Sequence, residues 1–161
     1  MIFGIFSGKS DNLDNKYVIS ISGTQKIDDE ISTQNVMTEA EYTEIDGNQI
    51  IKYKEFVSDD EEGDSVIDIE ITIENGIITL QKGVAGSEGM MIFEKEKLHT
   101  SVYISEVLPI TVNVFTHGIC NEISVDGGRL EIEYVVDFDG TFETENHIVI
   151  ILKKTEEKKD V

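Results

Sequence analysis

Residues 66–76 read VIDIEITIENG, and apolar and polar side chains alternate along this stretch. Ile67, Ile69, Ile71 and Ile73 fall on one face, and the polar side chains between them, which include Asp68 and Glu70, fall on the other. A period of two in β-branched residues is typical of a strand with one buried face. The stretch ends in an Asn-Gly pair, which supplies the positive φ angles that a tight hairpin requires. It therefore predicts a strand that turns back into a second strand.

The same pattern of alternation and glycine turns recurs through the chain. Three further turns separate alternating runs: Asp46-Gly47, Asp126-Gly127-Gly128 and Asp139-Gly140. Together the patterns predict strands at 17–27, 34–44, 49–57, 65–74, 77–82, 90–95, 98–104, 110–121, 129–137 and 146–154. No stretch longer than two turns has helical spacing.

Many short strands joined by hairpins must protect their edges, and a chain of eight to ten strands can do so by closing on itself. We therefore predict an all-β fold, an up-and-down antiparallel barrel of the calycin or lipocalin kind. The alternative is a two-sheet sandwich, but consecutive hairpins favour the barrel. Residues 17–154 are expected to form this single domain, after a polar lead-in over 1–16 and before a charged tail over 155–161.

The order of several short motifs resembles the YwiB-like family of uncharacterised bacterial proteins. The motifs are Tyr53-Lys54-Glu55, LQKG (80–83), HTSVY (99–103), VFT (114–116), GGRLEIEY (127–134) and ENHIVI (145–150). The resemblance implies a calycin-like barrel and no established activity, since a shared fold does not supply one. One position departs from the family, which commonly has arginine where this chain has Gln81.

Composition excludes several classes of partner. The chain has 33 acidic and 13 basic residues and a formal net charge of −20, a field that repels nucleic acid and anionic membrane surfaces. It has one cysteine, Cys120, so an intrachain disulfide is impossible, which is typical of a reducing compartment. The start has no basic region of a signal peptide, and no apolar run approaches the length of a membrane span. We expect a cytoplasmic protein.

No motif predicts an enzyme, a cofactor or a metal site. The acidic loop SDDEEGDS (58–65) does not match the calcium-loop template, because the twelfth residue is Ile69 where a glutamate is required. The glycine-rich GVAGSEG (83–89) lacks the Gly-Lys-Ser/Thr ending of a phosphate loop. His117 and Cys120 face opposite ways on a regular strand, so they could share an ion only if Gly118 forms a bulge.

The inward row of the predicted barrel is the candidate site. The expected lining residues are Tyr53, Glu55, Gln81, Tyr103, Thr116 and Tyr134. Polar groups converging in a mainly apolar cavity are typical of small-molecule sites, so the first hypothesis is a barrel that binds a small, mainly apolar ligand. In the second, these groups satisfy one another inside a filled barrel, and the protein is a non-enzymatic interaction or structural module with an acidic surface. Because Gln81 cannot neutralise a charge, Glu55 is expected either to be hydrogen-bonded by tyrosine or glutamine side chains or to have its charged form disfavoured by desolvation.

The charge generates a prediction about nucleic acid. A chain with a net charge of −20 and no basic stripe should show no salt-sensitive binding to random duplex DNA or single-stranded RNA at micromolar concentration and physiological salt. Filter binding or fluorescence anisotropy would measure this. Binding that weakens steeply with added salt would contradict the prediction.

Overall fold

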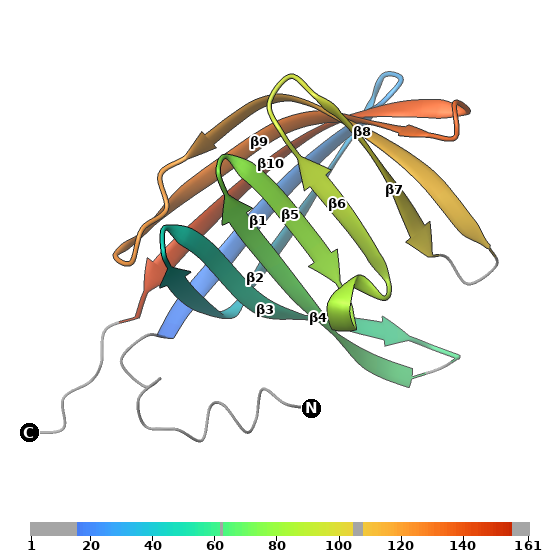
Figure 1. The fold of residues 1–161 in the computed structure, drawn as a ribbon. Helices are drawn as coiled ribbons and strands as arrows, with labels where there is room; N and C mark the ends of the chain where they lie inside the picture. The colour runs from blue at the N-terminus through green and yellow to red at the C-terminus, as the bar shows by residue number, and fades with distance from the viewer. Residues whose placement is uncertain (1–15, 62, 105–107, 156–161) are drawn as a thin grey trace, which may run out of the picture.

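A computed structural model describes residues 16–61, 63–104 and 108–155, which form ten antiparallel strands (Figure 1). Their bounds are β1 (Lys16–Ile27), β2 (Glu30–Ile45), β3 (Asn48–Asp59), β4 (Gly63–Glu74), β5 (Ile77–Lys82), β6 (Gly89–Phe93), β7 (Leu98–Ile104), β8 (Pro109–Asn121), β9 (Gly127–Phe138) and β10 (Phe142–Lys154). The described residues contain no α-helix, and a short 3-10 helix, η2 (Val84–Gly86), lies between β5 and β6. None of their helical segments has the length and apolarity needed to cross a membrane.

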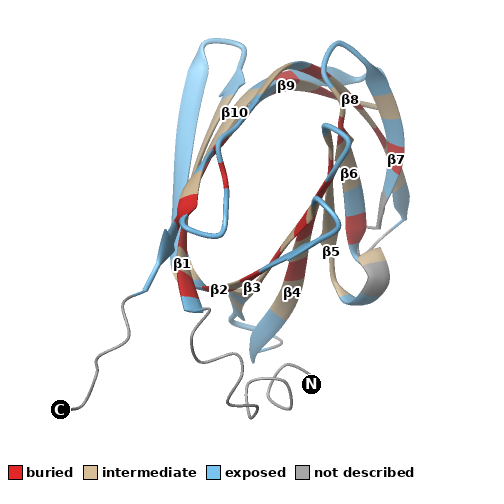
Figure 2. Cartoon of the chain, turned by 60° about the vertical axis from the view of Figure 1, so that its left-hand side comes forward, coloured by how far each residue is buried: buried red, intermediate tan, exposed pale blue. Residues whose placement is uncertain are grey.

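The strands follow one another around the sheet in the order β6-β5-β4-β3-β2-β1-β10-β9-β8-β7. Every neighbour is also a neighbour in sequence except the pair β1 and β10, which joins the two ends of the domain. The sheet curls into a nearly closed barrel, with buried positions recurring along its strands and exposed hairpin tips (Figure 2). The predicted all-β up-and-down barrel is confirmed, and the two-sheet sandwich is excluded.

The strand boundaries predicted from sequence are close to those in the structure, with two longer strands. β2 begins at Glu30 and β10 at Phe142, four residues before the predicted starts. Both added segments consist mainly of exposed residues without clear alternation. The backbone of each added segment continues the hydrogen-bonded pairing, of β2 with β1 and of β10 with β9. The starts of β2 and β10 are therefore defined by strand pairing and cannot be recognised from the hydrophobic pattern. The lead-in and tail lie outside the described residues, apart from Lys16 and Thr155.

Asn-Gly and Asp-Gly turns fix the registers of two hairpins. Asp46 and Gly47 have φ angles of 53° and 83°, and Asn75 and Gly76 have 51° and 78°. Two consecutive positive φ angles match the twist of a two-residue hairpin. The second turn places Glu74 opposite Ile77 and Ile73 opposite Ile78. Because paired residues face the same side of the sheet, this register determines which side chains of β5 point inward.

One end of the barrel is plugged by the segment between β8 and β9. Ile123 is buried there, and its backbone carbonyl accepts a hydrogen bond from Gln49 Nε2 at 2.6 Å. Asn121 Nδ2 donates to Gln49 Oε1 at 2.7 Å, and Asn121 Oδ1 accepts from the Ile123 backbone N–H at 3.0 Å. Gln49 Nε2 also donates to the hydroxyl of Tyr42 at 2.8 Å. The buried side chains of Gln49 and Tyr42 are therefore paired with each other, and Gln49 is also paired with the plug.

The barrel closes without a ladder between its last two edges. β6 and β7 are the terminal strands of the sheet, and no ladder joins them within the described residues. The connecting segment instead contacts β8, because the Glu96 backbone N–H donates to the Thr116 carbonyl at 2.7 Å. The Thr116 backbone N–H donates to the Lys97 carbonyl at 3.4 Å. A bulge follows in β8 between Thr116 and Gly118.

Two glycines allow the plug to approach the strands closely. Gly127 and Gly128 have φ angles of 101° and 139°. A Cβ atom on Gly127 would collide with the carbonyl oxygen of Leu152, and one on Gly128 with that of Glu122. Only glycine fits such positions without displacing the backbone.

Gly128→Ala should lower the free energy of unfolding by at least about 2 kcal/mol, because it combines a backbone collision with a strained φ angle. Gly118→Ala is the matched control, since a Cβ atom there meets nothing within 4 Å and its φ angle is ordinary. It should change stability by less than about 0.5 kcal/mol. Urea unfolding followed by circular dichroism would measure both, and equal stabilities for the two variants would contradict the close approach.

Candidate functional site

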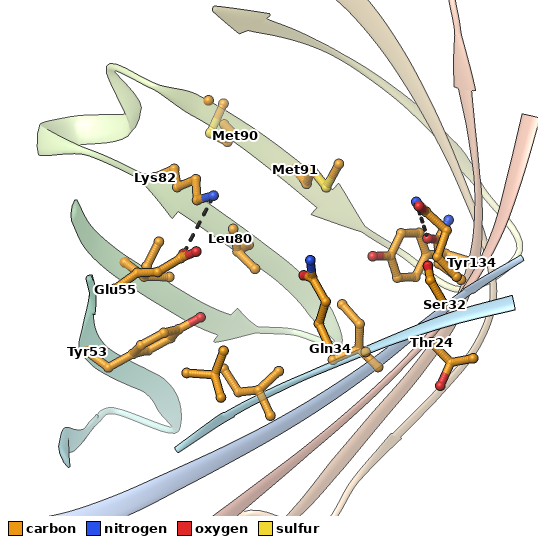
Figure 3. Close-up of a pocket in the computed structure, with 18 residues that line it drawn as sticks. Thr24, Ser32, Gln34, Tyr53, Glu55, Leu80, Lys82, Met90, Met91 and Tyr134 are labelled. Atoms are coloured by element: carbon orange, nitrogen blue, oxygen red, sulfur yellow. Dashed lines mark hydrogen bonds and ion pairs between the residues drawn. The ribbon is translucent and has the colours of Figure 1, made fainter. Parts of the chain in front are cut away.

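The barrel contains a cavity of about 370 Å³, shown in Figure 3. No residue of the plug belongs to its described lining. Its lining comes from β1, β2, β3, β4, β5, β6, β9 and β10. The described lining residues are Ile21, Gly23, Thr24, Gln25, Ser32, Gln34, Val36, Tyr53, Glu55, Ile69, Leu80, Lys82, Gly89, Met90, Met91, Tyr134, Asn146 and Ile148. The lumen is therefore filled at one end and hollow at the other, a combination that neither hypothesis from sequence contained.

The cavity has an apolar floor and a polar flank. Ile69, Leu80 and Met91 belong to the neighbouring strands β4, β5 and β6 and pack against the core. On the opposite flank, Gln25 Nε2 of β1 donates to Asn146 Oδ1 of β10 at 3.1 Å. The Asn146 amide group in turn donates to the carbonyl and hydroxyl oxygens of Thr144. These amides are already paired, so they form a fixed polar flank.

Two tyrosines of the lining each have a hydroxyl group with no described partner. Tyr53 of β3 and Tyr134 of β9 point into the cavity from different walls (Figure 3). Tyr53 is only 9% exposed and Tyr134 only 8%. Neither hydroxyl forms a hydrogen bond with a described residue. The ring of Tyr134 packs edge-on against Phe93, with centroids 4.8 Å apart, which fixes its direction.

Tyrosine, with an ordinary pKa of about 10, is protonated at neutral pH, and burial moves both phenols further in that direction. Burial raises the pKa of Tyr134 to about 12. Burial also raises the pKa of Tyr53, and the nearby negative charge of Glu55 raises it further. Both groups therefore retain an O–H donor at neutral pH.

Glu55 lines the cavity and forms an ion pair with Lys82. The Lys82 Nζ and Glu55 Oε2 atoms are 3.6 Å apart, and about a third of each side chain is exposed. The expectation that tyrosine or glutamine side chains bond Glu55 is therefore wrong. A cation on the neighbouring wall supplies its partner, and partial exposure makes the pair a modest contribution to stability.

The predicted position of Gln81 in the lining is corrected by the hairpin register. Ile71 pairs with Leu80 and Ile69 with Lys82, so Leu80 and Lys82 share the inner face. Gln81 pairs with Glu70 on the outer face and is absent from the described lining. The sequence could have predicted this, because residues paired across a two-residue hairpin face the same side of the sheet. Counting alternate residues from Ile73 across the Asn-Gly turn to Ile78 places Leu80 and Lys82, and not Gln81, on the inner face.

Thr116 and Tyr103 do not join the described cavity. Thr116 is fully buried beneath the segment that connects β6 and β7, opposite Tyr134 in the register, and its hydroxyl has no partner among the described residues. Tyr103 belongs to β7, but its side chain lies outside what the structure describes. Of the six predicted residues, the structure thus brings together Tyr53, Glu55 and Tyr134.

His117 and Cys120 belong to no group of three potential metal ligands within the described residues, although the bulge beside Gly118 is present. Glu131, Glu133 and His147 on the outer face of β9 and β10 do have ligand atoms within 4.8 Å of one another. The Glu131 carboxylate is already bound, by His147 Nε2 at 2.6 Å and by Arg129 at 2.7 Å. These contacts account for the group without an ion.

The two kinds of buried tyrosine generate a prediction. Tyr134→Phe should change the free energy of unfolding little near pH 8, because its hydroxyl has no described partner. Tyr17→Phe, the matched comparison, should cost about 1 kcal/mol, since it loses the 2.6 Å hydrogen bond that the Tyr17 hydroxyl donates to the Val125 carbonyl.

The same variants differ in alkaline solution. A phenol with a raised pKa stabilises the folded state fully below the unfolded value of about 10, and this contribution is lost as pH rises toward the folded value. The wild type should therefore lose stability between pH 10 and about 12, and Tyr134→Phe should lose less. Urea unfolding at several pH values would measure the slopes. Parallel curves for wild type and Tyr134→Phe would contradict the assignment.

Comparisons with known proteins agree with the fold. The crystal structure of the ywiB protein from Bacillus subtilis superposes with a TM-score of 0.74 at 13% identity, over 88% of this chain and 93% of that one. At this identity the likeness shows a shared barrel only. A search of curated proteins finds no match. A family model, Domain of unknown function (DUF1934), matches residues 19–150, and the chain therefore belongs to the DUF1934 family.

Proposed function

We propose that this protein is a non-enzymatic barrel that binds a small, mainly apolar molecule in the hollow part of its lumen. The observation that supports this most strongly is the pair of buried phenols, Tyr53 and Tyr134, directed into one cavity without a partner. At the plug, by comparison, the buried side chains of Gln49 and Tyr42 are hydrogen-bonded to each other. Unpaired donors lining a cavity are instead what a ligand site offers.

The size and lining of the cavity support a small ligand. A volume of about 370 Å³ falls at the lower end of the range of small-molecule sites. Isoleucine, leucine and methionine side chains supply the contact surface along β4, β5 and β6. Methionine adapts its shape to irregular apolar surfaces, and Met91 of β6, which pairs with Leu80, lies on the inner face beside the cavity (Figure 3).

The titratable groups of the cavity support binding over catalysis. The described lining contains no histidine, cysteine or aspartate, and its tyrosines are neutral at physiological pH, with pKa values that burial raises further. The remaining charged groups, Glu55 and Lys82, neutralise each other. No nucleophile lies next to a base in the described lining, so a covalent or acid–base reaction has no evident catalyst there. A cytoplasmic location suits the lone, exposed Cys120, which a reducing compartment keeps as a thiol.

A substitution that fills the cavity tests the proposal. Gly23 of β1 lines the cavity, and a Cβ atom built on it meets nothing within 4 Å. Gly23→Phe should therefore place a ring in the cavity with little change to the barrel. Ser22→Phe is the control, because the same ring would project from the other face of the same strand.

The measurement is fluorescence enhancement of the neutral probe N-phenyl-1-naphthylamine, with native mass spectrometry of gently purified protein. The wild type and Ser22→Phe should bind the probe, and Gly23→Phe should bind it at least about tenfold more weakly, a difference of about 1.4 kcal/mol. Circular dichroism would verify that both variants fold. The proposal is wrong if the wild type takes up no probe and retains no small molecule.

A further inference from the structure

We infer that the ligand of the cavity is a neutral molecule with an apolar body and an oxygen acceptor, such as a carbonyl group, that receives a hydrogen bond from Tyr53 or Tyr134. This inference rests on the proposed function, since it names the chemistry of the molecule that the cavity binds. Its basis is the state of the two phenols and the balance of charge around them.

The phenols set a requirement for hydrogen bonding. Each tyrosine is more than nine-tenths buried, and each hydroxyl is directed into the cavity without a described partner. A ligand that fills the cavity removes these hydroxyls from solvent. A pure hydrocarbon would leave them unpaired, which opposes binding, whereas a ligand oxygen would take the place of solvent as their partner.

The hydroxyls act as donors toward the ligand. A neutral phenol is a good donor, and a tyrosine with an ordinary pKa of about 10 is neutral at physiological pH. The Glu55 carboxylate lies two residues from Tyr53 on the same face of β3, but it is paired with Lys82 and accepts no described hydrogen bond from the Tyr53 hydroxyl. The missing component is an acceptor opposite the phenols, and the ligand supplies it.

The charges of the cavity favour a neutral ligand. Glu55 and Lys82 form an ion pair at 3.6 Å, so neither offers a free charge to a ligand ion. An anion must also approach a protein of net charge −20. A cation would have to leave water for a cavity in which the described carboxylate already has a partner. A carbonyl or ether oxygen accepts a hydrogen bond from the phenols without the repulsion that an anion meets or the desolvation that a cation requires.

Three naphthalene derivatives of similar size separate these possibilities. They are 2-ethylnaphthalene, which has no acceptor, 2-acetylnaphthalene, which has a neutral carbonyl, and 2-naphthoate, which is an anion. Displacement of N-phenyl-1-naphthylamine from the full-length protein gives their relative affinities. For the wild type we expect 2-acetylnaphthalene to bind about tenfold more tightly than 2-ethylnaphthalene, and more tightly than 2-naphthoate.

Removing both phenolic hydroxyls should abolish this preference. In the double variant Tyr53→Phe/Tyr134→Phe the rings remain, so 2-ethylnaphthalene should keep or improve its affinity while the advantage of 2-acetylnaphthalene falls to about twofold or less. Gly23→Phe, which fills the cavity, should weaken all three compounds together. This contrast separates loss of a hydrogen bond from loss of space.

The outcomes distinguish the inference from the proposed function. If the probe binds but the wild type does not favour the acetyl over the ethyl compound, the acceptor is not required and the inference fails. If 2-naphthoate binds most tightly, the ligand is not neutral and the inference also fails. If the double variant keeps the full preference for the acetyl compound, the phenols are not its donors. Only a failure to bind the fluorescent probe and every naphthalene would count against ligand binding itself.

Discussion

The register of the hairpins is the constraint on which the rest of this structure depends. Side chains alternate across a sheet, so a shift of one residue in any pairing would turn a whole strand inside out. The two-residue Asn75-Gly76 turn pairs Ile73 with Ile78, and this pairing directs Leu80 and Lys82 into the barrel. The ion pair of Lys82 with Glu55 and the apolar floor beside it both follow from that turn. An inserted residue there would exchange Lys82 for Gln81 in the cavity.

Local sequence patterns were sufficient to predict the strands and their closure, because alternation and turn chemistry act within a few residues. The same parity predicted that Tyr53, Glu55 and Tyr134 face inward, and the structure places all three in the cavity lining. The position of Gln81 was predicted wrongly because parity was not counted through the turn from β4 to β5. The information was present in the sequence, in the length of the turn.

The division of the lumen into a filled and a hollow part could not be predicted in this way. It depends on the plug, where Asn121 reaches Gln49 across 72 residues of sequence. No period or turn pair indicates a side-chain contact at such a separation. The tyrosines at the two ends of the barrel consequently differ in their hydrogen bonding. Tyr17 and Tyr42 have hydrogen-bond partners at the plug, whereas Tyr53 and Tyr134 have none among the described residues.

The pairing of β1 with β10 also has a consequence for biosynthesis. β1 emerges from the ribosome before β10, its partner in the closed barrel, which follows more than a hundred residues later, as the contact between Gln25 and Asn146 shows. Pairings of such high contact order form slowly, because a long loop must first close. Until β10 is complete, β1 keeps an open edge, and the flank of the cavity formed by Asn146 does not exist. The nascent chain therefore passes through a stage with an unprotected strand edge and no complete site, in which premature association with other chains is the principal hazard.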